Sequence, residues 1–143
     1  MRILLIHGPN LNTLGKRQPE LYGTLTLQEI EGRVAERARE LGVEIRRFQS
    51  NHEGALIDFI QAEAEGAQGI IINPGALTHY GLSLRDALEG CGLPFIEVHL
   101  TNIHAREPFR RRSVLAAIAQ EQIAGQGWQG YIHALEALVR ERS

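Results

Sequence analysis

The chain has 143 residues, of which 43% are hydrophobic and 22% charged, and its net charge at pH 7 is −2. These values are typical of one globular domain covering residues 1–143, and they give no electrostatic reason to expect binding to nucleic acid or to a membrane surface. The single cysteine, Cys91, excludes an intrachain disulfide, and no apolar stretch has the length of a signal peptide core or a membrane span. We therefore expect a cytoplasmic protein.

The first predicted strand, Arg2–His7, contains the apolar run Ile3–Ile6. The segment 8–23 that follows is longer than the ~2–6 residues usual between a strand and a helix, and it is rich in glycine, proline, amide and cationic residues. Open α/β sheets bind their ligands at the carboxyl ends of the strands. We therefore expect this segment to form part of an active site and regard it as a candidate lid.

Further strands and helices alternate along the rest of the chain. A capping-box pattern of Thr26 and Glu29 predicts a helix that runs to Leu41 and ends at Gly42. The other expected strands are Val43–Phe48, Gly69–Asn73, Pro94–Leu100 and a weak one at Gln122–Ala124. The other expected helices are Asn51–Glu65, Ser83–Glu89, Arg110–Ile118 and Gly130–Arg140.

The three consecutive isoleucines Ile70–Ile72 indicate a strand buried on both faces, as parallel sheets require. Alternating strands and helices with right-handed crossovers predict a parallel sheet covered by helices on both faces. Five strands favour a flavodoxin-like α/β fold with the strand order 2-1-3-4-5.

Polar side chains gather where the predicted strands end. They are His7 and Asn10 after the first strand, Ser50, Asn51, His52 and Glu53 after the second, Asn73, Thr78 and His79 after the third, and His99, Thr101, Asn102, Arg106 and Arg110 after the fourth. Amides both donate and accept hydrogen bonds, and arginine binds carboxylates bidentately. This edge of the sheet therefore predicts a site for a small, hydroxyl-rich anion, without the acidic cluster or cysteine pair that would hold a metal.

Taken together, these motifs resemble the type II 3-dehydroquinate dehydratases over nearly the whole chain. The matching pieces include Gly8–Asn12, Arg17, Tyr22–Gly23, Gln49–Gly54, Ile72–Ala76, Thr78–His79, Leu84–Leu88, Glu97–Leu100, Ala105–Glu107, Phe109–Arg110 and Gly130–Tyr131. The resemblance implies loss of water from 3-dehydroquinate to give 3-dehydroshikimate, in the shikimate pathway, with no cofactor and no metal.

The resemblance also implies roles for individual residues. Tyr22 would remove the proton beside the ketone, and His99 would protonate the departing hydroxyl. Arg17 would favour the ionised form of Tyr22, and Asn10 would help to hold a water that stabilises the enolate. The expected substrate contacts are Asn73, His79, Arg110 and the backbone at Leu100 and Thr101. Asp86 matches a residue that completes the site of a neighbouring subunit, in a homododecamer built from four trimers.

Elementary chemistry is compatible with these roles. A free tyrosine has a pKa of about 10, and a cation within about 4–6 Å lowers the pKa of an acid by about 1–3 pH units. Arg17 and Tyr22 are close enough in the loop for folding to bring them together. Histidine is a suitable acid because its pKa of about 6.5 is near neutral. The only lysine, Lys16, disfavours a route through a Schiff base.

Two other functions are compatible with the fold alone: a non-catalytic flavodoxin-like binding or signalling module, and another small-molecule lyase or isomerase. The first strand lacks the acidic residues of a phosphoryl-accepting receiver, and Gly8-Pro9-Asn10 is a poor phosphate loop. The remaining histidines, His7, His52, His104 and His133, are expected to be mostly structural. The aromatic residues Trp128 and Tyr131 are expected to serve in packing or at interfaces.

Overall fold

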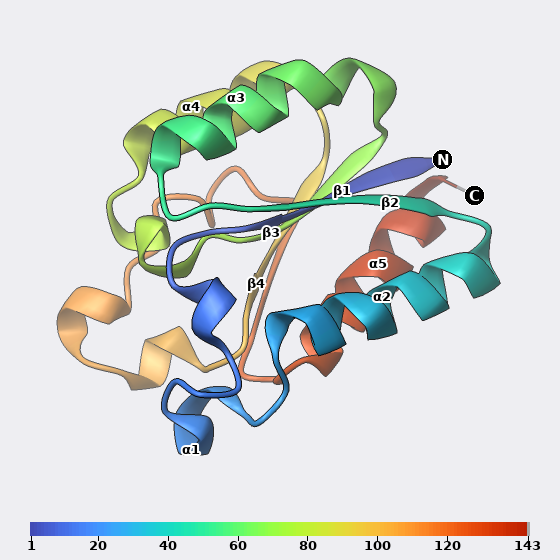
Figure 1. Ribbon diagram of the computed structural model, residues 1–143. Coiled ribbons are helices and arrows are strands. Elements are labelled where there is room, and N and C mark those ends of the chain that lie inside the picture. The colour runs from blue at the N-terminus through green and yellow to red at the C-terminus, as the bar shows by residue number, and fades with distance from the viewer. Residues whose placement is uncertain (143) are drawn as a thin grey trace.

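The computed structural model describes residues 1–142. They form a five-stranded parallel sheet with helices on both faces (Figure 1). The strands are β1 (Arg2–His7), β2 (Glu44–Gln49), β3 (Gly69–Asn73), β4 (Phe95–His99) and β5 (Glu121–Ala124). Their order in the sheet is β2-β1-β3-β4-β5, and every pair is parallel. The predicted flavodoxin-like arrangement is therefore confirmed.

Two pairs of helices cover the sheet. The helices are α1 (Pro19–Tyr22), α2 (Leu27–Leu41), α3 (Glu53–Glu63), α4 (Leu82–Cys91) and α5 (Gln129–Arg142). Figure 1 shows α3 and α4 on one face and α2 and α5 on the other, with the one-turn helix α1 beyond the carboxyl edge of the sheet. Within residues 1–142, no helix is both long and apolar enough to cross a lipid bilayer.

The core has two layers because successive residues of a strand point to opposite faces of the sheet. Ile3 and Leu5 of β1 pack in the layer that α2 and α5 complete, and Leu4 and Ile6 pack in the layer that α3 and α4 complete. All five residues of β3 are buried, which confirms that this strand is covered on both faces.

Helix α2 begins and ends as its sequence predicts. The Thr26 hydroxyl accepts a hydrogen bond from the Glu29 backbone N–H at 3.1 Å, and the Glu29 carboxylate accepts one from the Thr26 backbone N–H at 3.1 Å. Gly42 ends the helix with a φ of 72°, which glycine adopts without a Cβ penalty. The other predicted strands and helices are present with ends shifted by one or two residues, except one.

The prediction of a helix at Arg110–Ile118 is wrong. Beyond a short 3₁₀ turn that ends at Arg110, this connection between β4 and β5 is irregular. The Ser113 hydroxyl accepts hydrogen bonds from the backbone N–H groups of Leu115 and Ala116, each at 3.1 Å. The Val114 N–H donates to the carbonyl of Thr78 at 2.7 Å. These bonds satisfy the backbone outside a helix, as serine side chains commonly do.

The loops that follow β1 and β3 contact one another at the carboxyl edge of the sheet. The Gly8 N–H donates to the Asn73 carbonyl at 2.7 Å. A Cβ atom at Gly8 would lie 2.3 Å from the carbonyl oxygen of Pro74, so only glycine fits this crossing. The close contact fixes the relative positions of the two loops from which the site is built.

Candidate active site

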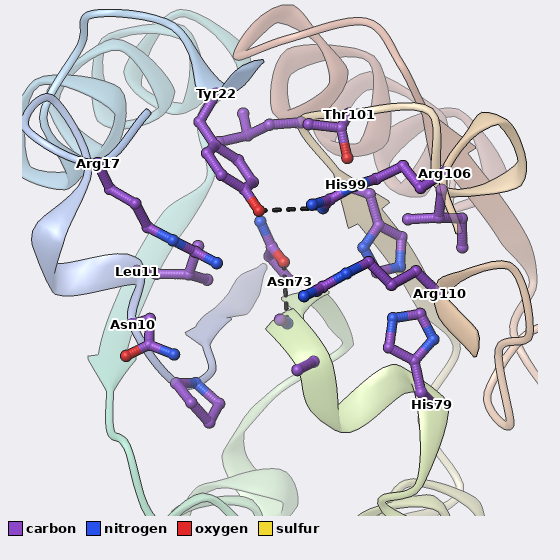
Figure 2. Close-up of a pocket in the computed structure, with 15 residues that line it drawn as sticks. Asn10, Leu11, Arg17, Tyr22, Asn73, His79, His99, Thr101, Arg106 and Arg110 are labelled. Carbon is purple, nitrogen blue, oxygen red and sulfur yellow. Dashed lines mark hydrogen bonds between the residues drawn. The ribbon is translucent and has the colours of Figure 1, made fainter. Parts of the chain in front are cut away.

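A pocket opens at the carboxyl ends of β1, β3 and β4 (Figure 2). It brings together all of the predicted site residues except Asp86. Those that line it are Asn10, Arg17, Tyr22, Asn73, His79, His99, Leu100, Thr101 and Arg110. The pocket therefore gathers side chains from the loop after β1, the turn after β3, the end of β4 and the loop that follows β4.

Asp86 lies elsewhere, on the exposed side of α4, and does not line this pocket. Its expected role requires a second subunit, so it stays a prediction.

Tyr22 lies between two arginines. It ends the one-turn helix α1, and the guanidinium carbon of Arg17 lies 4.3 Å from the centre of its ring. The Nη1 atom of Arg106 donates a hydrogen bond of 3.0 Å to the Tyr22 hydroxyl oxygen. Figure 2 shows the two guanidinium groups approaching the phenol from different sides. Two positively charged groups therefore lie beside the ring and the hydroxyl of Tyr22.

His99 is held by a buried carboxylate. Glu97 lies two positions earlier in β4, so the two side chains share one face of the sheet, and both are buried. The Nε2 atom of His99 lies 2.5 Å from Glu97 Oε2. Since a carboxylate only accepts hydrogen bonds, Nε2 carries the hydrogen, and Nδ1 has no hydrogen-bond partner in the part of the chain that the structure describes.

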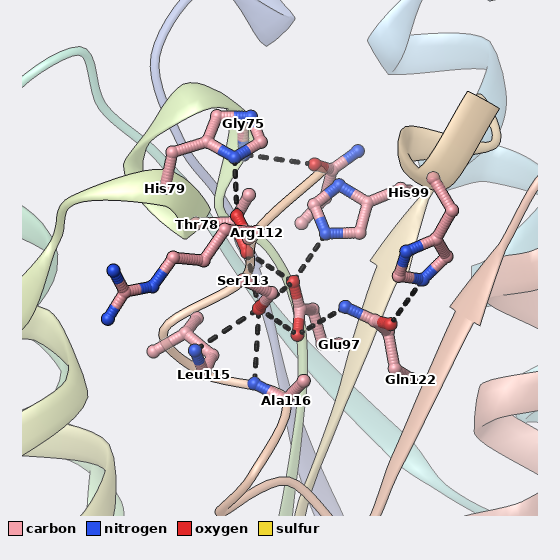
Figure 3. Close-up of polar contacts among 12 residues, drawn as sticks. Gly75, Thr78, His79, Glu97, His99, Arg112, Ser113, Leu115, Ala116 and Gln122 are labelled. Atoms are coloured by element: carbon pink, nitrogen blue, oxygen red, sulfur yellow. Dashed lines mark hydrogen bonds and ion pairs between the residues drawn. The ribbon is translucent and has the colours of Figure 1, made fainter. Parts of the chain in front are cut away.

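Figure 3 shows Glu97 at the centre of a polar network. Besides His99, its carboxylate accepts hydrogen bonds from the Thr78 hydroxyl, from the Ser113 hydroxyl at 2.9 Å and from Gln122 Nε2 at 3.1 Å. Burial opposes ionisation of Glu97, but the hydrogen bond and charge of His99, with the hydroxyls of Thr78 and Ser113, outweigh it. The pKa of Glu97 is therefore lowered from its ordinary value. An ionised Glu97 holds the imidazole of His99 in one orientation.

Asn10 and Asn73 both bring amide groups to the lining of the pocket, Asn10 from an exposed position and Asn73 from a buried one. Asn10 has a φ of 71°, a left-handed conformation that asparagine tolerates better than most residues. The Asn73 Oδ1 atom accepts a hydrogen bond from the Gly75 N–H at 3.1 Å, and its Nδ2 atom donates to the Tyr131 hydroxyl oxygen at 2.9 Å.

Cationic and polar groups complete the side of the pocket formed after β3 and β4. The Nδ1 atom of His79 donates to the carbonyl of Arg112 at 2.6 Å, which leaves Nε2 for a ligand. Arg110 pairs through Nε with the Glu107 carboxylate at 2.7 Å. No group of three or more His, Cys, Asp or Glu side chains within residues 1–142 is arranged to hold a metal ion.

Comparison with known proteins places the chain in a family. Residues 1–139 match the family Dehydroquinase class II. The chain belongs to this family. The 3-dehydroquinate dehydratase of Roseiflexus castenholzii is 62% identical over 142 residues, which are 99% of this chain and 90% of that protein. The corresponding enzyme of Herpetosiphon aurantiacus is 54% identical over 143 residues, which are 100% of this chain and 99% of its own.

A solved structure supports the same assignment. The type II dehydroquinase from Butyrivibrio crossotus superposes with a TM-score of 0.94 at 45% identity, covering 96% of this chain and 97% of its own. This dehydroquinase is therefore a 3-dehydroquinate dehydratase, a hydro-lyase of class EC 4.2.1.10, and the resemblance inferred from the sequence is confirmed.

The sequence did not predict three contacts of this dehydroquinase. Arg106 is expected at the rim without a contact to Tyr22, and Tyr131 is expected to serve in packing or at an interface. Glu97 received no role, although its spacing from His99 carried a signal. A glutamate within the otherwise apolar run of β4, two positions before a histidine, predicts a buried carboxylate on the same face as the imidazole.

Proposed function

We propose that this dehydroquinase removes water from 3-dehydroquinate through an enolate, with Tyr22 as the base and His99 as the acid. The observation that carries this proposal is that the phenol of Tyr22, held by Arg106, and the imidazole of His99, held by Glu97, line one pocket. A non-catalytic module would not require this pairing of a cation-flanked phenol with a carboxylate-bound imidazole.

In the first step, the Tyr22 phenolate takes the proton from the carbon beside the ketone. The electron pair of that C–H bond moves toward the carbonyl oxygen, which becomes an enolate. Arg17 and Arg106 place positive charge beside Tyr22 during this step. Asn10, which lines the pocket, helps to hold a water that donates to the enolate oxygen.

In the second step, the enolate re-forms the ketone and expels the hydroxyl on the β carbon. The departing hydroxyl takes a proton from Nδ1 of His99 and leaves as water. Glu97 supports this transfer because it holds the other ring nitrogen and so fixes the orientation of the ring. Transfer of the proton from Tyr22 back to the histidine, through solvent in the pocket, restores both groups.

Substrate binding is proposed to use the remaining groups of the pocket. Asn73, His79 and the backbone at Leu100 and Thr101 offer hydrogen bonds to the ring hydroxyls and carboxylate, and Arg110 offers a cation. The chemistry needs no cofactor. Residues 1–143 would form one catalytic domain of a cytoplasmic homododecamer, in which Asp86 completes the site of a neighbouring subunit.

The test of the mechanism is the conversion of 3-dehydroquinate by the purified protein, followed through the ultraviolet absorbance of the conjugated enone. Tyr22→Phe and His99→Ala should each lower kcat on the order of 10²–10⁴-fold, as loss of a general base or acid does. Tyr80→Phe is the matched control because Tyr80 is 63% exposed and lies outside the pocket lining. Activity retained in Tyr22→Phe would show that another group is the base.

A further inference from the structure

The hydroxyl group of Tyr131 reaches the floor of the active site from the far end of the chain. Tyr131 lies in α5, and none of its surface is exposed. In the described chain, its hydroxyl oxygen accepts one hydrogen bond, from Nδ2 of Asn73 at 2.9 Å, across a separation of 58 positions. Asn73 is itself 3% exposed and lines the pocket. A buried phenol therefore contacts the inner side of a residue whose outer side faces the pocket.

The partners of Asn73 determine which way its amide group points. The Gly75 backbone N–H can only donate a hydrogen bond, so the atom that faces it at 3.1 Å must be the amide oxygen. The nitrogen then lies toward Tyr131, whose hydroxyl oxygen accepts. In the flipped amide, the nitrogen and the Gly75 N–H would be two donors facing each other. The orientation shown is therefore the one that satisfies both partners.

One N–H of Asn73 remains after these two bonds. Each amide nitrogen carries two hydrogens, and Tyr131 accepts only one of them. The other has no hydrogen-bond partner within residues 1–142. An amide that is already held in one orientation loses less conformational entropy on binding than an amide that rotates freely. The remaining N–H of Asn73 therefore suits an oxygen of a polyhydroxylated ring.

The surroundings of Tyr131 suit a fixed, neutral acceptor. Burial raises the pKa of Tyr131, so the phenol stays protonated across the working range of the enzyme. The ring of His7 packs beside it with 5.8 Å between ring centres, and His7 in turn lies 3.0 Å from the Glu31 carboxylate. These neighbours hold the phenol ring in place from the side of β1 and α2.

We propose that Tyr131 is a positioning residue for substrate binding, whose hydroxyl fixes the Asn73 amide so that an N–H donor faces a substrate oxygen. The inference rests on the substrate contact proposed above for Asn73. It adds a group that touches neither the substrate nor the acid–base pair.

The test is a double-mutant cycle with Tyr131→Phe and Asn73→Ala, assayed with 3-dehydroquinate. Loss of one neutral hydrogen bond predicts that Tyr131→Phe raises KM about 3- to 15-fold, with kcat within about 3-fold of the original value. Asn73→Ala should raise KM by at least as much. In the double variant, KM should equal that of Asn73→Ala alone, because Tyr131 acts only through Asn73.

Each other outcome overturns the proposal in a distinguishable way. If Tyr131→Phe raises KM equally in both backgrounds, or leaves KM unchanged, Tyr131 does not act through Asn73. If Asn73→Ala binds substrate normally, the substrate contact of Asn73 is itself wrong. Tyr80→Phe serves as the control for removing a tyrosine hydroxyl, since Tyr80 is exposed. Circular dichroism and size-exclusion chromatography establish that each variant is folded and assembled.

A second measurement uses the protein with Tyr131 unchanged. In a ¹⁵N spectrum, the side-chain amide of Asn73 is assigned by its disappearance in Asn73→Ala. We expect one of its two hydrogens to exchange slowly with solvent, because it is donated to a buried oxygen. Two hydrogens that exchange at the same fast rate would overturn the proposal.

Discussion

Arg106 donates a hydrogen bond of 3.0 Å to the hydroxyl oxygen of Tyr22, although 84 positions separate the two residues. The bond joins the loop after β1 to the loop after β4, across the mouth of the pocket. A single contact therefore orients the proposed base, places a positive charge beside it and connects two loops that line the pocket.

Replacing Arg106 should weaken the base without disturbing the fold. In Arg106→Gln, we expect kcat/KM at pH 7 to fall about 10- to 100-fold, because the hydroxyl oxygen of Tyr22 loses its hydrogen bond from a charged donor. Arg112→Gln is the matched control, with an exposed arginine on the same connection. A kcat/KM equal to that of the unaltered enzyme would contradict the role of Arg106.

Glu97 should make the free energy of unfolding depend on pH in the acid range. Its pKa is lowered in the folded protein, so its contribution to the free energy of unfolding is present above its ordinary value of about 4.5 and is lost as pH falls through the lower folded value. Glu97→Gln should cost roughly 1–3 kcal/mol at pH 7, and the difference between the two proteins should narrow below pH 4.5. Urea unfolding at several pH values measures this. A difference that stays constant down to pH 3 would exclude an ionised Glu97.

Alanine substitution at two glycines, one at the loop crossing and one elsewhere as a control, tests how much the crossing contributes to stability. Gly8→Ala should destabilise the protein by about 3 kcal/mol, because the new Cβ would lie 2.3 Å from the Pro74 carbonyl oxygen. Gly32→Ala, in the exposed middle of α2, meets no atom within 4 Å and should stabilise by about 0.5–1 kcal/mol. Denaturation midpoints of both variants check the prediction, and equal midpoints would contradict it.

Mixing subunits tests the role proposed for Asp86. Asp86→Ala and Tyr22→Phe should each have low activity alone. When the two inactive proteins are unfolded and refolded together, mixed assemblies should contain intact sites that combine Tyr22 from one subunit with Asp86 from another, so activity should return. If the mixture stays as inactive as its components, Asp86 does not serve a neighbouring subunit.

The sheet and most of the site could be predicted because local patterns carry them. The isoleucine run of β3, the capping box of α2 and the polar residues that follow each strand are features of consecutive residues. The parallel topology then brings strand ends together, so the meeting of Asn10, Asn73 and His99 at one pocket followed from strand order alone.

Contacts set by tertiary packing could not be predicted. The segment after Arg110 has residues compatible with a helix. Instead, the Ser113 hydroxyl accepts hydrogen bonds from two backbone N–H groups, and a carbonyl in the turn after β3 accepts one from a third. The pairing of Arg106 with Tyr22 depends on two loops whose paths no periodicity describes. The hydrogen bond between Tyr131 and Asn73 depends on where α5 packs against the sheet. A hydrophobic pattern alone does not give that position accurately enough to predict a single hydrogen bond.

The positions of Tyr131 and Gln122 also bear on how the enzyme matures during synthesis. Both residues follow residue 120, yet they contact Asn73 and Glu97, which emerge from the ribosome much earlier. The four strands β1 to β4 can pair before that point, but the amide and carboxylate of the active site then lack these two partners. During synthesis, the hydrogen bonds to Asn73 and Glu97 can therefore form only after Tyr131 and Gln122 have been added to the chain.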